Sequence, residues 1–358
     1  MKVLNWLLLF VPIAIGLKFL APERYLLIFL AASLAILPLA GWMGRATEQL
    51  AERMGEGVGG LLNATFGNAA ELIIALAALR AGLHDVVKAS IIGSIVGNIL
   101  LVLGAAMLAG GLRHREQHYN PAGARSQATM LTLAAIALVL PAAFQIAAGS
   151  TPEGLGRLSV SISIVLLLVY LLFLIFTLVT HSSLFAGSHA PEEGEGHAAP
   201  WPVSRSALVL VAATGAVAWI SEILVGAIEP TAHELGLSNV FVGVFVVAIL
   251  GNAAEHATAI TVALKNRMDL SLSIAIGSSV QVALFVAPLL VVVSLFLGPM
   301  PMDLAFPAGL VLIVLLSVLI TSQVAGDGRS DWLKGLQLLA VYLVLGLTYF
   351  FLPGVTAH

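Results

Sequence analysis

The chain has 358 residues, of which 59% are hydrophobic and only 10% are charged. Soluble globular proteins carry about 25% charged residues, so this composition indicates an all-α polytopic membrane protein whose main partner is the lipid bilayer. The net charge of −3 provides no basic patch for nucleic acid, and the absence of cysteine excludes disulfides, thiolate metal sites and cysteine nucleophiles.

Apolar segments follow one another along the whole chain. A helix needs roughly 20 mostly apolar residues to cross about 30 Å of hydrocarbon. By this measure the sequence predicts eleven transmembrane helices, namely Val3–Leu20, Tyr25–Gly44, Leu61–Leu79, Val86–Leu108, Gln127–Ala147, Arg157–Val179, Arg205–Ile228, Val240–Leu264, Leu270–Leu297, Leu304–Ser322 and Trp332–Leu352. No small-x-small cleavage site follows the first segment, so we interpret it as a retained span and not as a signal peptide. Residues 45–60 are charged and rich in glycine, and we expect an amphipathic or broken stretch at the membrane surface there.

One block of sequence occurs twice. The motif Gly67-Asn68-Ala69-Ala70-Glu71 returns 184 residues later as Gly251-Asn252-Ala253-Ala254-Glu255, and Gly93-Ser94 has the same offset from Gly277-Ser278. Both copies lie inside long apolar runs. An ionised acid near the centre of a bilayer costs at least about 2.5 to 3.5 kcal/mol, and such acids occur there mainly in ion pathways and proton relays.

The repeat defines the domain organisation that we expect. Residues 1–22 form an N-terminal helix, 23–180 form a first repeat with spans two to six, 181–203 form an acidic cytoplasmic loop, and 204–353 form a second repeat with spans seven to eleven. Because each repeat has an odd number of spans, the two copies point in opposite directions across the membrane. This inverted-repeat plan is typical of secondary transporters with a site at the midplane. The loop carries the candidate regulatory residues Glu192, Glu193 and Glu195, although an acidic loop is more often a solvated linker.

Lysine and arginine predict the orientation of the chain, because they are enriched in cytoplasmic loops. With the amino terminus inside, eleven of the sixteen basic residues lie on the cytoplasmic side and five on the other side. We therefore expect a cytoplasmic amino terminus, an external carboxyl terminus and a location in the inner membrane of a prokaryotic cell.

The two motif glutamates are expected near the middle of the membrane. Glu71 precedes Arg80 by nine residues and Glu255 precedes Lys265 by ten. At about 1.5 Å of rise per residue, each acid is about 14 to 15 Å from a charged helix end, or half the hydrocarbon thickness. Inverted helices would bring the two carboxylates together at the pseudo-two-fold axis, where a divalent cation could neutralise both. A structural ion pair is the alternative reading, but we find no lysine or arginine at matching depth.

Neutral oxygen ligands surround each acid in the sequence. Asn68 and Asn252 precede Glu71 and Glu255 by three residues and therefore share a helix face with them. Gly67 and Gly251 make local unwinding inexpensive, which would expose backbone carbonyls. Calcium prefers six to eight such oxygens. The candidates to complete the shell are Ser94, Asn98, Ser278 and Gln281, although such residues also pack or hydrogen-bond helices together. His256 lies about 100° around the helix from Glu255, where it is placed to hydrogen-bond, to gate or to take part in proton coupling.

These motifs resemble the two α-repeats of the calcium/proton exchangers, within the calcium/cation antiporter superfamily. The resemblance rests on two extended segments in each half of the chain, Gly67–Ile74 with Gly93–Asn98 and Gly251–His256 with Gly277–Phe285. It implies an antiporter that exchanges cytosolic calcium for protons, with Glu71 and Glu255 as the shared sites of ion and proton binding.

Several alternatives remain at this point. A passive divalent-cation channel would also use acids at the midplane, and so would an antiporter that prefers another divalent cation such as manganese. A membrane enzyme fits poorly, since we find no His-Glu-x-x-His, Gly-x-Ser-x-Gly or P-loop motif. We expect no cofactor, only calcium and protons as transported ions, and the sequence leaves open whether the protein is a homo-oligomer.

Overall fold

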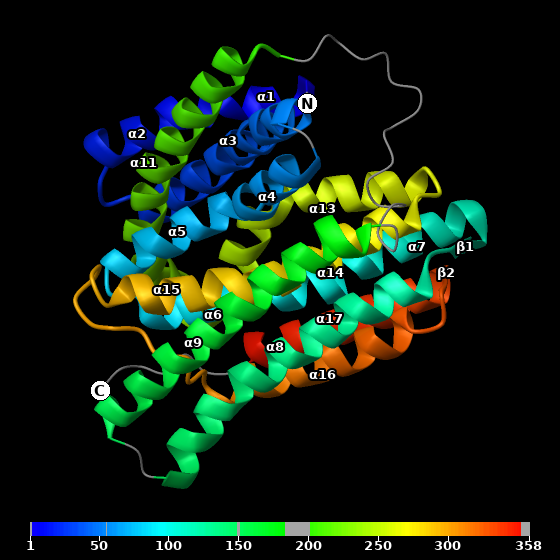
Figure 1. The fold of residues 1–358 in the computed structure, drawn as a ribbon. Coiled ribbons are helices and arrows are strands. Elements are labelled where there is room, and N and C mark those ends of the chain that lie inside the picture. Colours follow the sequence, from blue (N-terminus) through cyan, green and yellow to red (C-terminus); the bar gives the residue numbers. More distant parts are fainter. Residues whose placement is uncertain (1, 55, 149–150, 183–200, 352–358) are drawn as a thin grey trace. The chain divides into compact units, whose positions relative to one another are not determined.

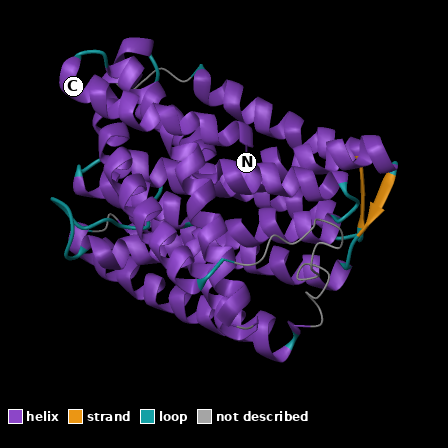
Figure 2. Cartoon of the chain, turned by 90° about the horizontal axis from the view of Figure 1, so that it is seen from above, coloured by secondary structure: helices purple, strands orange, loops and turns teal. Residues whose placement is uncertain are grey.

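The computed structural model describes residues 2–54, 56–148, 151–182 and 201–351, and these residues are almost entirely helical (Figure 1). Among them, nine helices are long and apolar enough to cross a membrane. Figure 2 shows the helices together with one pair of short strands. The chain is therefore a helical membrane protein with multiple apolar spans, as its composition predicts.

The chain divides into two compact units, and each unit combines segments from both halves of the sequence. The first comprises Met1–Ser90, Glu192–Ala254 and Phe350–His358, and the second comprises Ile91–Pro191 and Glu255–Tyr349. The divisions fall inside two helices, α6 after Ser90 and α13 after Ala254. The elements of the first unit are α1 (Lys2–Trp6), the 3₁₀ helix η1 (Leu7–Leu9), α2 (Phe10–Leu20), α3 (Tyr25–Met54), α4 (Glu56–Phe66), α5 (Ala69–Arg80), the start of α6 (His84–Val96), α11 (Val203–Leu235), α12 (Asn239–Phe241), the π-helical η5 (Val242–Val247) and the start of α13 (Ala248–Leu264).

In the first unit the two long helices α3 and α11 pack along each other. Helix α2 also packs on α3, and α5 packs on α11. The buried face of α3 carries small and branched side chains such as Ala32, Ala35 and Ile36, together with the unbranched Met43. Small residues let helix backbones approach closely, which is how helices associate where lipid is as apolar as the interface.

The segment around the first motif differs from a single straight span. Helix α4 ends at Phe66 and α5 begins at Ala69, so a turn at Gly67 and Asn68 interrupts the predicted helix. The amide of Gly67 still donates to the Asn63 carbonyl at 2.8 Å, but the regular pattern does not continue through the turn. Glycine lacks a side chain and makes such an interruption inexpensive.

The expectation of an amphipathic or broken surface stretch over residues 45–60 is only partly met. Helix α3 continues without interruption through Arg45 to Met54, and α4 already begins at Glu56. Ala46, Thr47 and Leu50 extend the buried face of α3 beyond the apolar core of the span. Packing against a neighbouring helix stabilises the extra turns that hydropathy alone does not predict.

The second unit begins with the end of α6, from Ile91, and also contains α13 from Glu255 onward. Its elements are the π-helical η2 (Gly97–Val102), α7 (Leu103–His114), β1 (Glu116–His118), α8 (Pro121–Ala148), α9 (Pro152–Ile175), the π-helical η3 (Phe176–Thr180), α14 (Met268–Gln281), the π-helical η6 (Val282–Val286), α15 (Ala287–Ser294), α16 (Ala308–Ala325), β2 (Arg329–Asp331) and α17 (Trp332–Phe350). Helix α8 packs on α9, α14 and α16, and α15 packs on α9. Gly104 of α7 lies against Gly335 of α17, where an added Cβ would meet backbone atoms, so these two helices pack in close contact.

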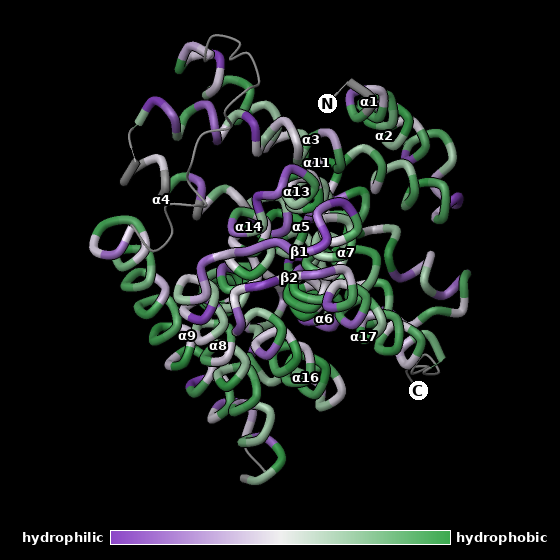
Figure 3. The backbone as a smooth tube through the Cα atoms, turned by 90° about the vertical axis from the view of Figure 1, so that its right-hand side faces the viewer, coloured by the Kyte–Doolittle hydropathy of each residue, from purple (hydrophilic) through white to green (hydrophobic). Residues whose placement is uncertain are grey.

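A two-stranded antiparallel sheet, which sequence analysis did not predict, joins the end of α7 to the start of α17. Its register pairs Glu116 with Asp331 and His118 with Arg329. Figure 3 shows both strands as hydrophilic and most helices as hydrophobic. The sheet is therefore a polar connection outside the apolar spans.

Candidate functional site

Both motif glutamates lie on helices that sequence patterning predicts, but in different compact units. Glu71 is on α5, in the first unit. Helix α13 is divided between the units, and Glu255 is the residue at which its second-unit part begins. Each is therefore described with the residues of its own unit. Both glutamates are partly buried.

Glu71 lies in the first turn of α5, directly after the break in the helix. Asn68 occupies the position before this helix, and its side chain is 1% exposed and makes no capping hydrogen bond to the helix. The first amides of a helix carry partial positive charge, which favours a carboxylate in the first turn. The interruption at Gly67 and Asn68 thus creates a helix amino terminus next to Glu71, in the interior of what sequence analysis predicts as one span.

Gly251 makes room for the Glu71 side chain. A Cβ atom added at position 251 would lie 2.6 Å from Glu71 Cγ, which is closer than real Cβ atoms approach other carbons. Glycine at this place in the second motif therefore lets the acid of the first motif lie directly on α13. Glycine makes a local kink or unwinding inexpensive, and at Gly251 α13 continues as a helix without unwinding.

Asn252 is also buried, with 1% of its surface exposed. Its Nδ2 donates to the carbonyl of Ala248, one turn earlier, at 3.0 Å. The amide nitrogen is thus engaged with the helix backbone, and the side-chain oxygen is the atom chemically suited to a cation. Within the first unit, Asn68, Glu71, Gly251 and Asn252 come from the two copies of the repeated motif.

In the second unit a hydrogen-bonded chain connects three helical segments. His256 Nε2 donates to Asn98 Oδ1 at 3.0 Å, and Asn98 Nδ2 donates to Ser278 Oγ at 3.0 Å. The Ser278 hydroxyl in turn hydrogen-bonds the carboxyl group of Glu255. Because an amide oxygen only accepts, the proton of this contact is on His256 Nε2. Asn98 is therefore the centre of a network that orients Glu255.

The other predicted oxygen donors of this unit are buried near the same elements. Ser94 is 4% exposed on α6, and Gln281 is 9% exposed at the end of α14. In this group of residues, the atoms Glu255 Oε2 and Gln281 Nε2 are buried without a hydrogen-bond partner in the described part of the chain. Sequence analysis did not select Ser279, whose hydroxyl lies between two carbonyls, 3.0 Å from that of Ala275 in α14 and 3.2 Å from that of Ile95 in α6.

Three π-helical turns accompany the motifs, and sequence analysis missed them. Asn98 lies within η2, η5 directly precedes α13, and η6 directly follows Gln281. A π-turn adds one residue to the helical repeat and is often found at functional sites. No residue type signals such a turn. The segments η2 and η6 consist mainly of apolar residues, which fit an α-helix equally well.

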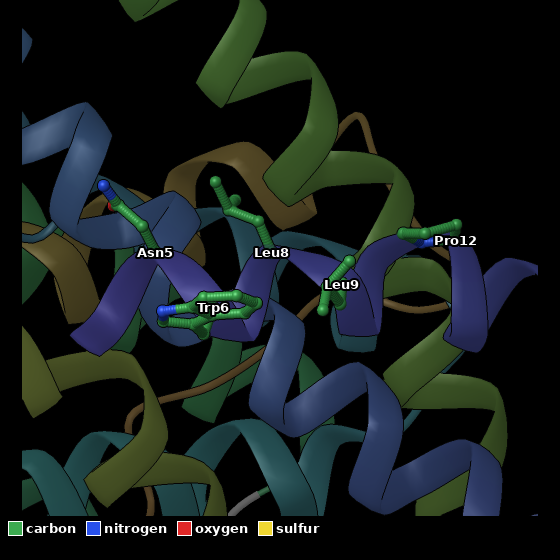
Figure 4. A pocket seen from close by; sticks show the side chains of 5 residues that line it. All are labelled: Asn5, Trp6, Leu8, Leu9 and Pro12. Atoms are coloured by element: carbon green, nitrogen blue, oxygen red, sulfur yellow. The ribbon is translucent and has the colours of Figure 1, made fainter. Parts of the chain in front are cut away.

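A pocket elsewhere in the first unit has a different character. It lies on α1, η1 and the start of α2 and is lined by Asn5, Trp6, Leu8, Leu9 and Pro12 (Figure 4). Its lining carries no acid, so it does not resemble the surroundings of Glu71 or Glu255. The candidate regulatory residues Glu192, Glu193 and Glu195 lie outside the described residues.

Polar groups beside the short sheet form a separate structural cluster. Lys334 Nζ binds Asp327 Oδ2 at 2.5 Å and the Arg329 carbonyl at 2.7 Å. Burial raises the pKa of Asp327, but the hydrogen bonds from Lys334 and from the Arg329 amide lower it by more, so the group stays ionised below its usual range. Burial and nearby acids raise the pKa of Tyr119, whose hydroxyl donates to the Val324 carbonyl at 3.2 Å. These contacts hold a connecting segment in place.

Comparison with known proteins gives a consistent result. The family model described as "Sodium/calcium exchanger protein" matches residues 24–179 and 205–351. The chain is 45% identical to a Ca(2+)/H(+) antiporter of Synechocystis sp., covering 98% of both chains. It is 48% identical to a Ca(2+)/H(+) antiporter of Aphanothece halophytica, covering 98% of this chain and 96% of the relative.

A solved structure is also similar. The structure of native YfkE superposes with a TM-score of 0.81 at 40% sequence identity, and the match covers 96% of this chain and 97% of that one.

Proposed function

This chain belongs to the sodium/calcium exchanger protein family, and we propose that it is a secondary active antiporter that exchanges cytosolic calcium for protons. The observation that carries the proposal is a matched pair of glutamates in duplicated motifs within a chain that is 45% to 48% identical to Ca(2+)/H(+) antiporters over nearly its full length. Membrane acids of this kind typically serve ion pathways and proton relays.

The proposed architecture has eleven spans in two inverted repeats after an N-terminal helix. Besides the nine long helices of the described residues, Leu4–Leu20 is apolar and α4 with α5 covers the predicted third span. The family match in two segments, 24–179 and 205–351, lies close to the proposed repeats 23–180 and 204–353. A broken helix beside the site is a device that many inverted-repeat transporters use to expose polar backbone groups to an ion.

The proposed binding site is the one that the repeated motifs predict at the midplane. Glu71 and Glu255 would supply the charge, and the remaining oxygens would come from neutral side chains of both motifs, namely Asn68, Asn252, Ser94, Asn98, Ser278 and Gln281. In this arrangement Asn98, which accepts from His256 and donates to Ser278, would position Glu255 through the Ser278 hydroxyl. Calcium prefers oxygen ligands of these types at roughly 2.3 to 2.6 Å.

Electrostatics supplies the coupling in this proposal. One calcium ion neutralises two ionised carboxylates, and two protons do the same. Either loaded form can change its access from one side of the membrane to the other, whereas the empty dianion would carry uncompensated charge through a low-dielectric environment. Exchange of two protons for one calcium ion is therefore the simplest ratio for alternating access.

Transport in sealed vesicles tests this function. Purified protein is reconstituted into proteoliposomes, and calcium uptake is measured with an imposed proton gradient and with the gradient collapsed by an ionophore. The antiporter proposal predicts uptake against a calcium gradient only when protons flow the other way. Calcium flux that follows its own gradient and ignores pH would support a channel. Manganese in place of calcium, at equal concentration, decides which divalent cation is preferred.

A further inference from the structure

An arginine and tryptophan cluster lies beside the last third of α3 and the first turn of α11, within the first unit. The ring of Trp201 stacks on Trp42 with centroids 5.8 Å apart. The guanidinium carbon of Arg45 is 5.2 Å from the Trp201 ring centroid, and that of Arg205 is 4.4 Å from it. Trp201 is held in this position because its backbone amide donates to Gln49 Oε1 at 2.8 Å. Two cations thus lie next to one buried aromatic ring.

The two arginines carry positive charge that the described part of the chain does not compensate. Within that part, no carboxylate lies at ion-pair distance from Arg45 or from Arg205. Cation–π contacts with Trp201 hold the two guanidinium groups as neighbours, although like charges repel. A guanidinium has five N–H donors in a planar fork that fits phosphate oxygens, and an aromatic face leaves these donors available. The cluster therefore has the chemistry of an anion site.

The cluster lies at the depth of lipid headgroups. Arg45 follows Tyr25, the first residue of α3, by twenty positions. At 1.5 Å of rise per residue this is about 30 Å, one hydrocarbon thickness. Arg205 is in the first turn of α11, at the end of its span. Tryptophan is enriched at this level of a membrane.

Apolar surface continues from the cluster into the membrane. On α11, Leu208 lies one turn after Arg205 and Val211 a further turn along, and each is 70% exposed. On the other side, Trp42 Nε1 donates to Asn5 Oδ1 at 3.1 Å, and Asn5 belongs to the pocket formed with Trp6, Leu8, Leu9 and Pro12 (Figure 4). Four of these five lining residues are apolar. A ligand with a negative head and hydrocarbon chains matches this combination, whereas free phosphate uses only the head.

We propose that Arg45 and Arg205, arranged around Trp201 and Trp42, bind the phosphate headgroup of an anionic phospholipid whose acyl chains lie along Leu208 and the α1–α2 pocket. The lipid site uses none of the residues of the proposed ion site, and lipid binding does not depend on the transport activity. The orientation predicted by the basic residues places it in the cytoplasmic leaflet, where anionic lipids attract juxtamembrane basic groups.

Native mass spectrometry of the full chain in detergent tests the proposal. Phosphatidylglycerol and phosphatidylcholine with identical acyl chains are titrated separately, and the affinity for the first bound lipid is compared among variants. Wild-type protein should prefer phosphatidylglycerol. Arg45→Gln and Arg205→Gln should each weaken phosphatidylglycerol binding about fivefold, and the double variant roughly 25-fold. Binding of phosphatidylcholine should change little.

Matched controls make the outcome decisive. The variant Arg24→Gln/Arg157→Gln removes the same amount of charge from other helix ends and should bind phosphatidylglycerol like the wild type. If R45Q/R205Q is not monodisperse, the single variant Arg205→Gln is compared with the wild type instead, because the Arg205 side chain is exposed and its replacement should not disturb the fold. Equal binding of the two lipids by the wild type, equal losses in the control and the cluster variant, or displacement of the lipid by the same concentration of inorganic phosphate would overturn the proposal.

Discussion

At the scale of single residues, the two glutamates differ in their position on the helix and in their hydrogen bonding. Glu71 lies at a helix amino terminus created by the break at Gly67 and Asn68. Glu255 lies inside the regular helix α13 and is hydrogen-bonded by Ser278. The duplicated motif thus gives two acids with the same sequence surroundings but different backbone geometry. This asymmetry is compatible with the proposed inverted-repeat antiporter, in which the two halves exchange roles as access alternates between the two sides of the membrane.

We predict that Glu71→Gln and Glu255→Gln each abolish calcium transport. Glutamine keeps the shape of the side chain but removes a charge that calcium needs. The fold should survive, because an uncharged side chain is less costly to bury, and the midpoint of thermal unfolding should stay within about 3 °C of the wild type. Asn68→Ala and Asn252→Ala should reduce transport less, since water can replace a neutral oxygen. Normal proton-driven uptake by either glutamine variant would remove these residues from the site.

A second prediction separates two roles for His256. If His256 positions Asn98, then His256→Gln should retain more than half of the transport rate, because the glutamine amide can still donate to Asn98 Oδ1. His256→Ala should lose at least about fivefold, because it leaves the buried Asn98 oxygen without its donor. If His256 instead carries a transported proton, both variants should fail equally in proton-driven uptake measured across a pH series.

At the scale of helices, hydropathy and spacing predict most of the architecture. The predicted spans Tyr25–Gly44 and Trp332–Leu352, for example, correspond to α3 (Tyr25–Met54) and α17 (Trp332–Phe350). Apolar length decides where a helix can lie in lipid, and this is a property of the sequence alone. The extension of α3 to Met54 was not predictable in this way, because packing against neighbouring helices stabilises it.

The site was predictable only as a set of candidates. The positions of Glu71 and Glu255 follow from the repeat, since acids in apolar runs are rare. The contact of Gly251 with Glu71 involves residues 180 positions apart, and the link from His256 to Asn98 joins separate helices. Pairing between distant segments depends on tertiary packing. No local sequence pattern specifies this pairing. The π-turns also have no local sequence pattern, so they were not predictable either.

The close contact of α13 with α5 leads to a prediction about helix packing. Gly251→Ala should force the Glu71 side chain into another rotamer, because the new methyl group would occupy the space of Cγ. Calcium affinity should weaken about 10- to 100-fold, as expected when a ligand is displaced by about 1 Å. The matched control is Gly226→Ala in α11, where an added Cβ meets no atom within 4 Å. Equal calcium affinity in the two variants would show that Glu71 does not need its present position.

At the scale of the whole molecule, the span count and the basic residues predict the placement of the termini. The proposed count of eleven spans, an odd number, would place the two ends of the chain on opposite sides of the membrane. A reporter fused after His358 should therefore read as external, and one inserted in the loop of residues 181–203 should read as cytoplasmic. Enzyme reporters that are active only on one side of the membrane make the measurement. A cytoplasmic signal after His358 would mean that the number of spans is even.

The central claim is that calcium and protons bind the same two carboxylates in turn. Calcium binding to the purified, detergent-solubilised protein, measured by isothermal titration between about pH 5 and 8, tests it most directly. Because bound calcium must displace protons, the apparent dissociation constant should rise as pH falls, approaching about 100-fold per pH unit when two protons compete. Each binding event should also release protons to the buffer. A dissociation constant that stays the same across this range, with no proton release, would contradict the shared site.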